Sequence, residues 1–86
     1  MAELSLKVVT PEKEIFEGKA SQVNIQTVEG ILGILPSHTP LMAKIKPGEL
    51  TIKHSGAKET HMAVGDGFMQ VADNVMTVMT DLAIEA

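Results

Sequence analysis

The chain has 86 residues, of which 44% are hydrophobic and only 2% aromatic, and its seven basic and eleven acidic residues give a net charge of −4. This length supports one small domain with one modest core, so we expect a single domain over residues 1–86. The hydrophobic share excludes a disordered chain. Scattered lysines and a near absence of aromatic residues exclude a nucleic-acid-binding protein. The absence of cysteine excludes disulfides, thiolate zinc sites and iron–sulfur clusters.

The N-terminal residues do not form a targeting signal. Polar residues interrupt the first nine positions, so the apolar core of a signal peptide is missing. No segment approaches the roughly 18 consecutive apolar residues that cross a bilayer. We therefore expect a soluble protein in a cytoplasm-like compartment.

Short segments that alternate between apolar and polar residues, separated by turn-forming residues, indicate β-strands. In chain order, we expect strands at residues 4–9, 23–27, 31–35, 41–45, 50–53, 60–64, 68–72 and 75–80. Turns are expected at Glu29-Gly30, at 55–58, at 65–67 and, as a two-residue hairpin, at Asp73-Asn74. Only residues 81–86 are expected to begin a helix, with Asp81 as its N-cap. This pattern predicts an all-β fold, a two-sheet β-sandwich or flattened barrel of many short strands.

The residue patterns that support catalysis are missing. Gly65-Asp66-Gly67 begins like the dinucleotide-binding motif G-x-G-x-x-G, but Gln70 occupies the third glycine position and a strand follows instead of a helix. The sequence has neither a phosphate-binding Walker loop nor a G-x-S-x-G nucleophile elbow. The acidic residues are dispersed, as on a solvated surface, and we expect no catalytic residues.

Three histidines raise the question of a metal site. His54 and His61 flank a predicted hairpin, and a zinc site there would need Glu59 or Asp66 as a further ligand. We favour two separate solvated side chains, because the spacing is not typical of zinc ligands. His38 lies in a loop bounded by Pro36 and Pro40, where a histidine bonded to the backbone is the simpler interpretation.

The methionines divide into two groups. Met69, Met76 and Met79 lie within predicted strands, where filling the core is the expected role. Met42 lies in a segment that follows Pro40, where an adaptable contact surface is as plausible as burial. A β-sandwich without catalytic machinery is expected to act by binding another protein.

The most specific stretch of the sequence spans residues 29–41 and reads EGILGILPSHTPL, followed by IKPG at residues 45–48. It resembles the E-G-x-L-G-I-x-P-x-H-x-P-L segment of the epsilon subunit of F-type ATP synthases. Residues 6–12, LKVVTPE, resemble the opening strand and turn of that subunit. Residues 65–80 resemble its closing Gly-rich turn, strand, Asn turn and strand. The likeness runs in register over residues 4–84.

The resemblance implies a non-catalytic subunit of the rotor, without metal or cofactor, at the foot of the gamma subunit and on the ring of c subunits. It implies that Glu29, Gly30 and Ile31 contact the ring, and that Thr10, His38 and Ala43 contact gamma. The subunit would couple proton or sodium flow to ATP synthesis. It would lie at the cytoplasmic face of a bacterial inner membrane or the stromal face of a thylakoid.

The sequence departs from the family pattern at two points. Ile31 stands where many members carry an acidic residue, which leaves Glu29 as the charged candidate for the ring contact. The C-terminal helical pair of many members is not in this sequence, so the chain is either a naturally short subunit or an excised domain. Two other hypotheses remain open: a β-sandwich adaptor for some other partner, and a small metal-dependent enzyme using His54 and His61.

Overall fold

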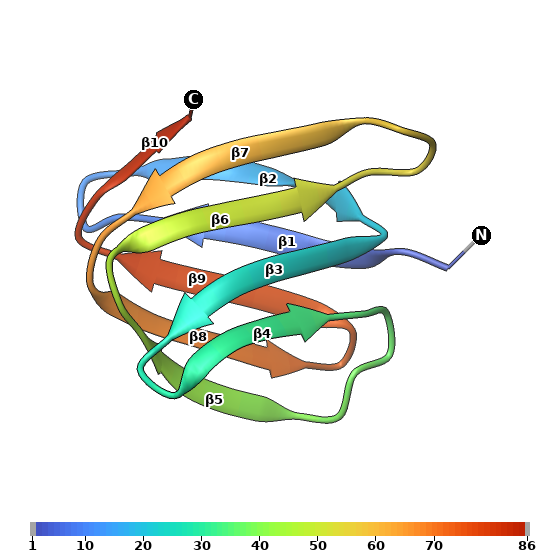
Figure 1. Ribbon diagram of the computed structural model, residues 1–86, viewed down its shortest axis with the longest axis horizontal. Helices are drawn as coiled ribbons and strands as arrows, with labels where there is room; N and C mark the ends of the chain where they lie inside the picture. The colour runs from blue at the N-terminus through green and yellow to red at the C-terminus, as the bar shows by residue number, and fades with distance from the viewer. Residues whose placement is uncertain (1, 86) are drawn as a thin grey trace.

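The computed structural model describes residues 2–85, and every element of secondary structure within that range is a β-strand (Figure 1). Within these residues, no helix is long and apolar enough to cross a bilayer. The strands, in chain order, are β1 Leu4–Val9, β2 Glu14–Ala20, β3 Gln22–Thr27, β4 Gly30–Ile34, β5 Leu41–Ile45, β6 Gly48–Lys53, β7 Glu59–Val64, β8 Gly67–Ala72, β9 Val75–Thr80 and β10 Ala83–Glu85.

The strands form two layers that are joined where β3 meets β5. Hydrogen bonding follows the order β10-β7-β6-β3-β5-β8-β9-β1-β2, and β4 pairs with β3 outside this path. In Figure 1, β4, β3, β6 and β7 form the front layer, and β5, β8, β9, β1 and β2 lie behind them. Thr27 and Ile45 make the one bridge between β3 and β5. The expected two-sheet β-sandwich is confirmed.

The core lies between the two layers and is filled by alternate residues of the strands. Because side chains alternate between the faces of a strand, each strand turns every second residue to the interior, as Leu4, Leu6 and Val8 do in β1. Aliphatic side chains and methionines fill it, as the low aromatic content requires. The buried hydrophobic residues are Leu4, Leu6, Val8, Ala20, Val23, Ile25, Ile34, Ile45, Leu50, Ile52, Met62, Val64, Met69, Val71, Met76 and Val78.

The expected hairpin at Asp73-Asn74 is confirmed, and the turn after β3 lies one residue earlier than predicted. Asp73 and Asn74 have φ of 52° and 61°, the left-handed conformation that a two-residue hairpin of the common primed type requires. The β3–β4 turn is formed by Val28 and Glu29, and Gly30, with φ of 127°, opens β4. Few residues other than glycine adopt that angle.

The predicted helix at residues 81–86 is wrong, because the chain continues as a strand within its described residues. Ala83–Glu85 forms β10, antiparallel to β7, with Ala83 opposite Val64. Thr80, 4% exposed, accepts the backbone N–H of Leu82 through its Oγ1, and the Gly65 N–H donates to the Leu82 carbonyl at 2.9 Å, which holds the chain next to the end of β7. Asp81 therefore follows a strand and caps no helix.

Two further expectations need correction. Strand β2 was not predicted, since its outward residues are charged and Gly18 interrupts the pattern. Met79 is 42% exposed and not in the core, because it points outward from β9. Met69 and Met76 are buried as expected, and Met42, left open between core and surface, lies on the surface with 67% exposed.

Candidate functional site

A cleft opens between β4 and β5, at the side of the sandwich where a single bridge between β3 and β5 joins the two layers. β4 pairs with β3 along its whole length, whereas β5 meets β3 only at its last residue. The strands therefore diverge and leave a cleft of ≈ 570 Å³. It is lined by Thr27, Val28, Glu29, Leu32, His38, Leu41, Met42, Ala43 and Lys44.

His38 lies in this cleft with its ring held by the backbone. Its Nδ1 is 2.8 Å from the Thr39 carbonyl oxygen. A carbonyl oxygen only accepts hydrogen bonds, so Nδ1 carries a proton and donates it to Thr39, which leaves Nε2 for other partners. The His38 backbone N–H donates to the Leu35 carbonyl at 3.2 Å, which closes the turn that begins the loop.

Asn74 holds the His38 loop from the β8–β9 hairpin, a role that sequence reasoning missed. Its Oδ1 accepts the Ser37 N–H at 2.8 Å, and its Nδ2 donates to the Glu3 carbonyl at 2.9 Å. Ser37 itself has φ of 63°, so the loop is tightly turned at this point. The sequence indicated only a turn at Asn74, because the bonded residues lie 37 and 71 positions away.

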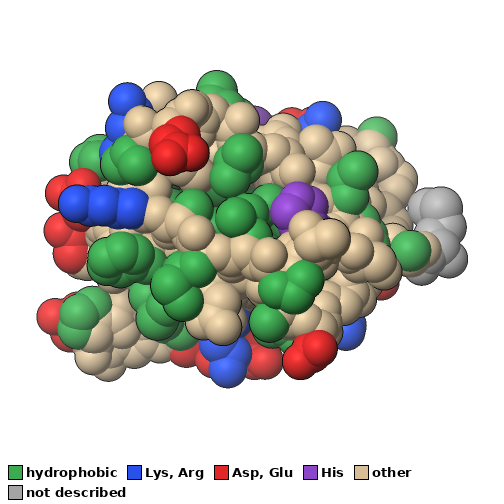
Figure 2. Space-filling model, turned by 90° about the horizontal axis from the view of Figure 1, so that it is seen from below, with side chains coloured by type: hydrophobic (Ala, Val, Ile, Leu, Met, Phe, Trp, Pro, Cys, Tyr) green, Lys and Arg blue, Asp and Glu red, His purple; other side chains and the backbone are tan. Residues whose placement is uncertain are grey.

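Hydrophobic side chains gather on the face of the molecule that contains this cleft (Figure 2). Val28, Leu35 and Met42 are more than half exposed. Phe68 on β8 is also exposed, and it is paired with Lys44 on the neighbouring strand β5. An exposed apolar surface with polar groups at its periphery is typical of a protein-binding site.

The structure brings together two of the three residues predicted to contact gamma. His38 and Ala43 line the same cleft. Thr10 lies elsewhere, in a hollow of ≈ 320 Å³ formed by Val9, Thr10, Pro11, Asp66, Gly67, Met79, Thr80 and Asp81. Thr10 closes a turn there through its N–H and Oγ1, which both donate to the Lys13 carbonyl at 2.9 and 3.2 Å.

A row of outward side chains joins the hollow at Thr10 to the cleft. Lys44 pairs with Phe68, Phe68 with Met79, and Met79 with Val9. Paired residues on one face of a sheet lie in contact distance of each other. The three apolar members, Val9, Met79 and Phe68, therefore form a continuous strip across β1, β9 and β8.

The three residues predicted to contact the ring lie together at the β3–β4 hairpin. Glu29 and Ile31 are exposed, Ile31 to 74%. Thr27, which is 2% exposed, fixes the hairpin: its Oγ1 donates to the Gly30 carbonyl at 2.8 Å and accepts the Glu29 N–H at 3.2 Å. The hairpin therefore presents an acidic and an apolar side chain on a rigid turn.

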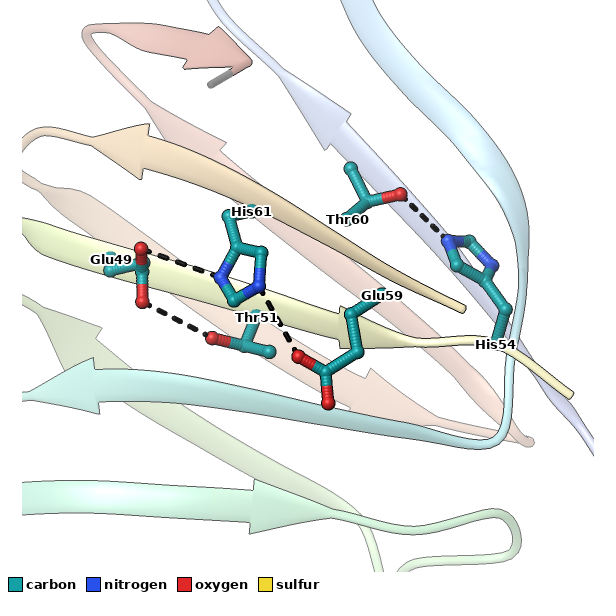
Figure 3. Close-up of polar contacts among 6 residues, drawn as sticks. All are labelled: Glu49, Thr51, His54, Glu59, Thr60 and His61. Carbon is teal, nitrogen blue, oxygen red and sulfur yellow. Dashed lines mark hydrogen bonds and ion pairs between the residues drawn. The ribbon is translucent and has the colours of Figure 1, made fainter. Parts of the chain in front are cut away.

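His54 and His61 do not converge on a common site (Figure 3). Nε2 of His54 lies 2.8 Å from Thr60 Oγ1, and its ring packs at 6.5 Å from that of Phe16. His61 lies between two carboxylates, with Nε2 3.2 Å from Glu59 and Nδ1 3.4 Å from Glu49. Within residues 2–85, no group of three or more histidine or acidic side chains is arranged to hold a metal ion. The structure gives the zinc hypothesis no support.

Residues 3–86 match the family model described as the beta-sandwich domain of the ATP synthase delta/epsilon chain. The chain belongs to this family. It is 37% identical over 83 residues to the ATP synthase epsilon chain of Brevibacillus brevis and 41% identical over 86 residues to that of Bordetella petrii. These alignments cover 96% and 100% of the chain but 63% and 61% of the relatives. The resemblance to the epsilon subunit is thus confirmed, and the chain spans less than two thirds of the relatives' length.

Solved structures of ATP synthases contain the same fold. The chain matches a subunit in the Euglena gracilis mitochondrial ATP synthase, OSCP/F1/c-ring, with a TM-score of 0.91 and 25% identity, over 99% of this chain and 54% of that one. A chain of the Tetrahymena thermophila mitochondrial ATP synthase, central stalk and c-ring, gives a TM-score of 0.76 at 20% identity, over 93% and 64% of the two chains, and supports the fold alone.

Proposed function

We propose that this chain is the β-sandwich domain of an epsilon-type subunit in the central stalk of an ATP synthase driven by protons or sodium ions. It links the gamma shaft to the ring of c subunits and so couples ion flow to ATP synthesis. In this proposal the domain does no chemistry of its own and transmits torque through its contacts. Its place is peripheral, at the cytoplasmic face of a bacterial inner membrane or the stromal face of a thylakoid.

The observation that carries the proposal is the apolar cleft that holds His38 and Ala43, in a chain whose relatives are epsilon chains. We assign gamma to the side of the sandwich formed by this cleft and the strip that leads to Thr10. We assign the ring to the β3–β4 hairpin, where Glu29, Gly30 and Ile31 lie together.

Binding to a catalytic complex that retains gamma but lacks its epsilon subunit tests this proposal. We expect one-to-one co-elution of the purified chain at micromolar concentration, and a loss of at least tenfold in affinity on Ala43→Glu or His38→Glu. Ala57→Glu is the matched control, because Ala57 is exposed in the β6–β7 loop. Circular dichroism shows whether each variant is folded. Absence of wild-type binding overturns the stalk proposal in favour of an adaptor for another partner.

A further inference from the structure

One edge of β4 has no neighbouring strand among residues 2–85, because β4 pairs with β3 alone. The hydrogen bonds of β3 show which backbone N–H and C=O groups of β4 point to this edge. The Val28 N–H donates to the Lys44 carbonyl and the Lys46 N–H donates to the Gln26 carbonyl, so these groups of β3 point to β5. The backbone N–H and C=O of Thr27, between them, therefore point the opposite way, to β4. Bonded and non-bonded pairs alternate in an antiparallel ladder. Leu32 and Ile34 therefore bond to β3, whereas the N–H and C=O of Ile31 and Gly33 point to the open edge.

β4 lacks the protection that the other outer strands of the sandwich have. Charged side chains and prolines on an edge strand discourage pairing with another chain. β2 carries Glu14, Glu17 and Lys19, β10 has three residues and ends at Glu85, and β5 follows Pro40 and contains Lys44. Residues 30–35, GILGIL, contain neither a charge nor a proline. An apolar edge of this kind is expected to be covered by another strand in the working protein.

Gly33 lies in the middle of β4 and carries no side chain. Glycine inside a strand often marks a place where another backbone comes near. A Cβ on Gly33 would lie 3.1 Å from Asn24 Oδ1 and 3.2 Å from Gln22 Nε2, the two amide groups that bond to each other at 2.9 Å. The bare glycine leaves that pair intact and keeps the edge free of a side chain in the middle of the strand.

We propose that β4 receives one extended segment of the gamma-type shaft protein, which adds a strand to this edge and covers the cleft. The inference rests on the proposed function and names the contact by which the shaft is held. β4 runs from the hairpin with Glu29 to the loop with His38, so a strand along it spans both ends of the cleft. The two N–H and two C=O groups of Ile31 and Gly33 bind the backbone of that segment.

The cleft also defines the side chains of the incoming segment. Leu32, Leu41 and Ala43 require small or apolar residues on the side that faces the cleft. At the His38 end of the cleft, Nδ1 is bound to the Thr39 carbonyl, so Nε2 is the ring nitrogen left for a polar group of the incoming segment.

Gly33→Pro tests the proposal, because proline removes the N–H on the open edge without removing a bond to β3. Gly33→Ala is the matched control: it adds the same Cβ and keeps the N–H. With the gamma-containing complex described above, we expect Gly33→Pro to weaken binding about tenfold or more and Gly33→Ala to change it less than about threefold. Equal binding by both variants, with the wild type bound, overturns the added strand and leaves the stalk function standing.

Hydrogen exchange measured by mass spectrometry over residues 30–35 gives a direct readout. We expect the amides of Ile31 and Gly33, which face the open edge, to become protected when the wild-type chain is in the complex. Unchanged exchange in a formed complex overturns the added strand. No complex with the wild-type chain overturns the stalk function, and with it the assigned occupant. Concentration-dependent dimers of the free wild type that disappear in Gly33→Pro, without binding to gamma, assign the edge to a second copy and overturn the proposal.

Discussion

Asn74 does not line the cleft, but its hydrogen bonds hold in place the loop that contains His38. Its side chain joins the chain's start, at Glu3, to the loop that contains His38, and its carbonyl accepts the Ser5 N–H at 3.1 Å. Its φ of 61° also lies in the region that asparagine and glycine tolerate best. The orientation of His38 therefore depends on a residue in a different hairpin.

We expect Asn74→Ala to lower the free energy of unfolding by about 2 kcal/mol, because two backbone groups lose their partners and alanine adopts the turn poorly. Asn74→Gly separates the two causes, since glycine keeps the backbone angle and removes only the amide. Its expected cost is about 1 kcal/mol. Urea unfolding of the three proteins measures both. An unchanged midpoint for Asn74→Gly would mean that the amide bonds contribute nothing net.

At the scale of the element, the turn between β7 and β8 depends on a close approach of backbones. Gly67 opens β8 opposite Thr80, and a Cβ there would overlap the Met79 carbonyl oxygen and lie 2.8 Å from the Cα of Thr80. Thr80 Oγ1 accepts the Gly65 N–H and donates to the Asp66 carbonyl, each at 3.1 Å, so the turn and β9 are fixed to each other. Neither strand can move to relieve the overlap without breaking these bonds.

Gly67→Ala should therefore destabilise the fold by about 3 kcal/mol or more, since the obstruction is backbone. Gly33→Ala is the comparison, because the Cβ there meets the ends of two flexible side chains. Its expected cost is about 1 kcal/mol or less. Thermal unfolding followed by circular dichroism compares the two variants directly. Equal melting temperatures would show that β8 and β9 separate more easily than the contacts imply.

The elements themselves were largely predictable, because alternation of apolar residues survives in every strand with a buried face. β2 escaped prediction since Ile15 and Phe16 are only partly buried and its other residues suit water as well as a sheet. β10 depends on pairing with β7, which no local pattern reports. The cleft was not predictable, because it arises where β3 bonds to β4 throughout and to β5 only at Ile45. The tie between Ser37 and Asn74 is likewise long-range.

At the scale of the whole molecule, the apolar strip of Val9, Met79 and Phe68 explains how distant residues can meet one partner. Thr10 and Ala43 lie at different hollows, and the strip lies between them across β1, β9 and β8. A shaft protein that covers the strip would touch both hollows at once. The strip is the part of this surface that the sequence did not indicate, because Met79 was assigned to the core.

Phe68 is the residue in the strip whose replacement separates binding from folding. It is 52% exposed, so Phe68→Ser should change the free energy of unfolding by about 1 kcal/mol or less. Aromatic side chains at the centre of an interface often dominate its affinity, and we expect at least a tenfold loss of binding to the gamma-containing complex. Ile84→Ser, at a residue 56% exposed on β10 in the other layer, is the control and should bind as the wild type. Titration of the complex with each variant, alongside its melting temperature, makes the comparison. Wild-type affinity for Phe68→Ser would remove the strip from the shaft-binding surface and leave Thr10 outside it.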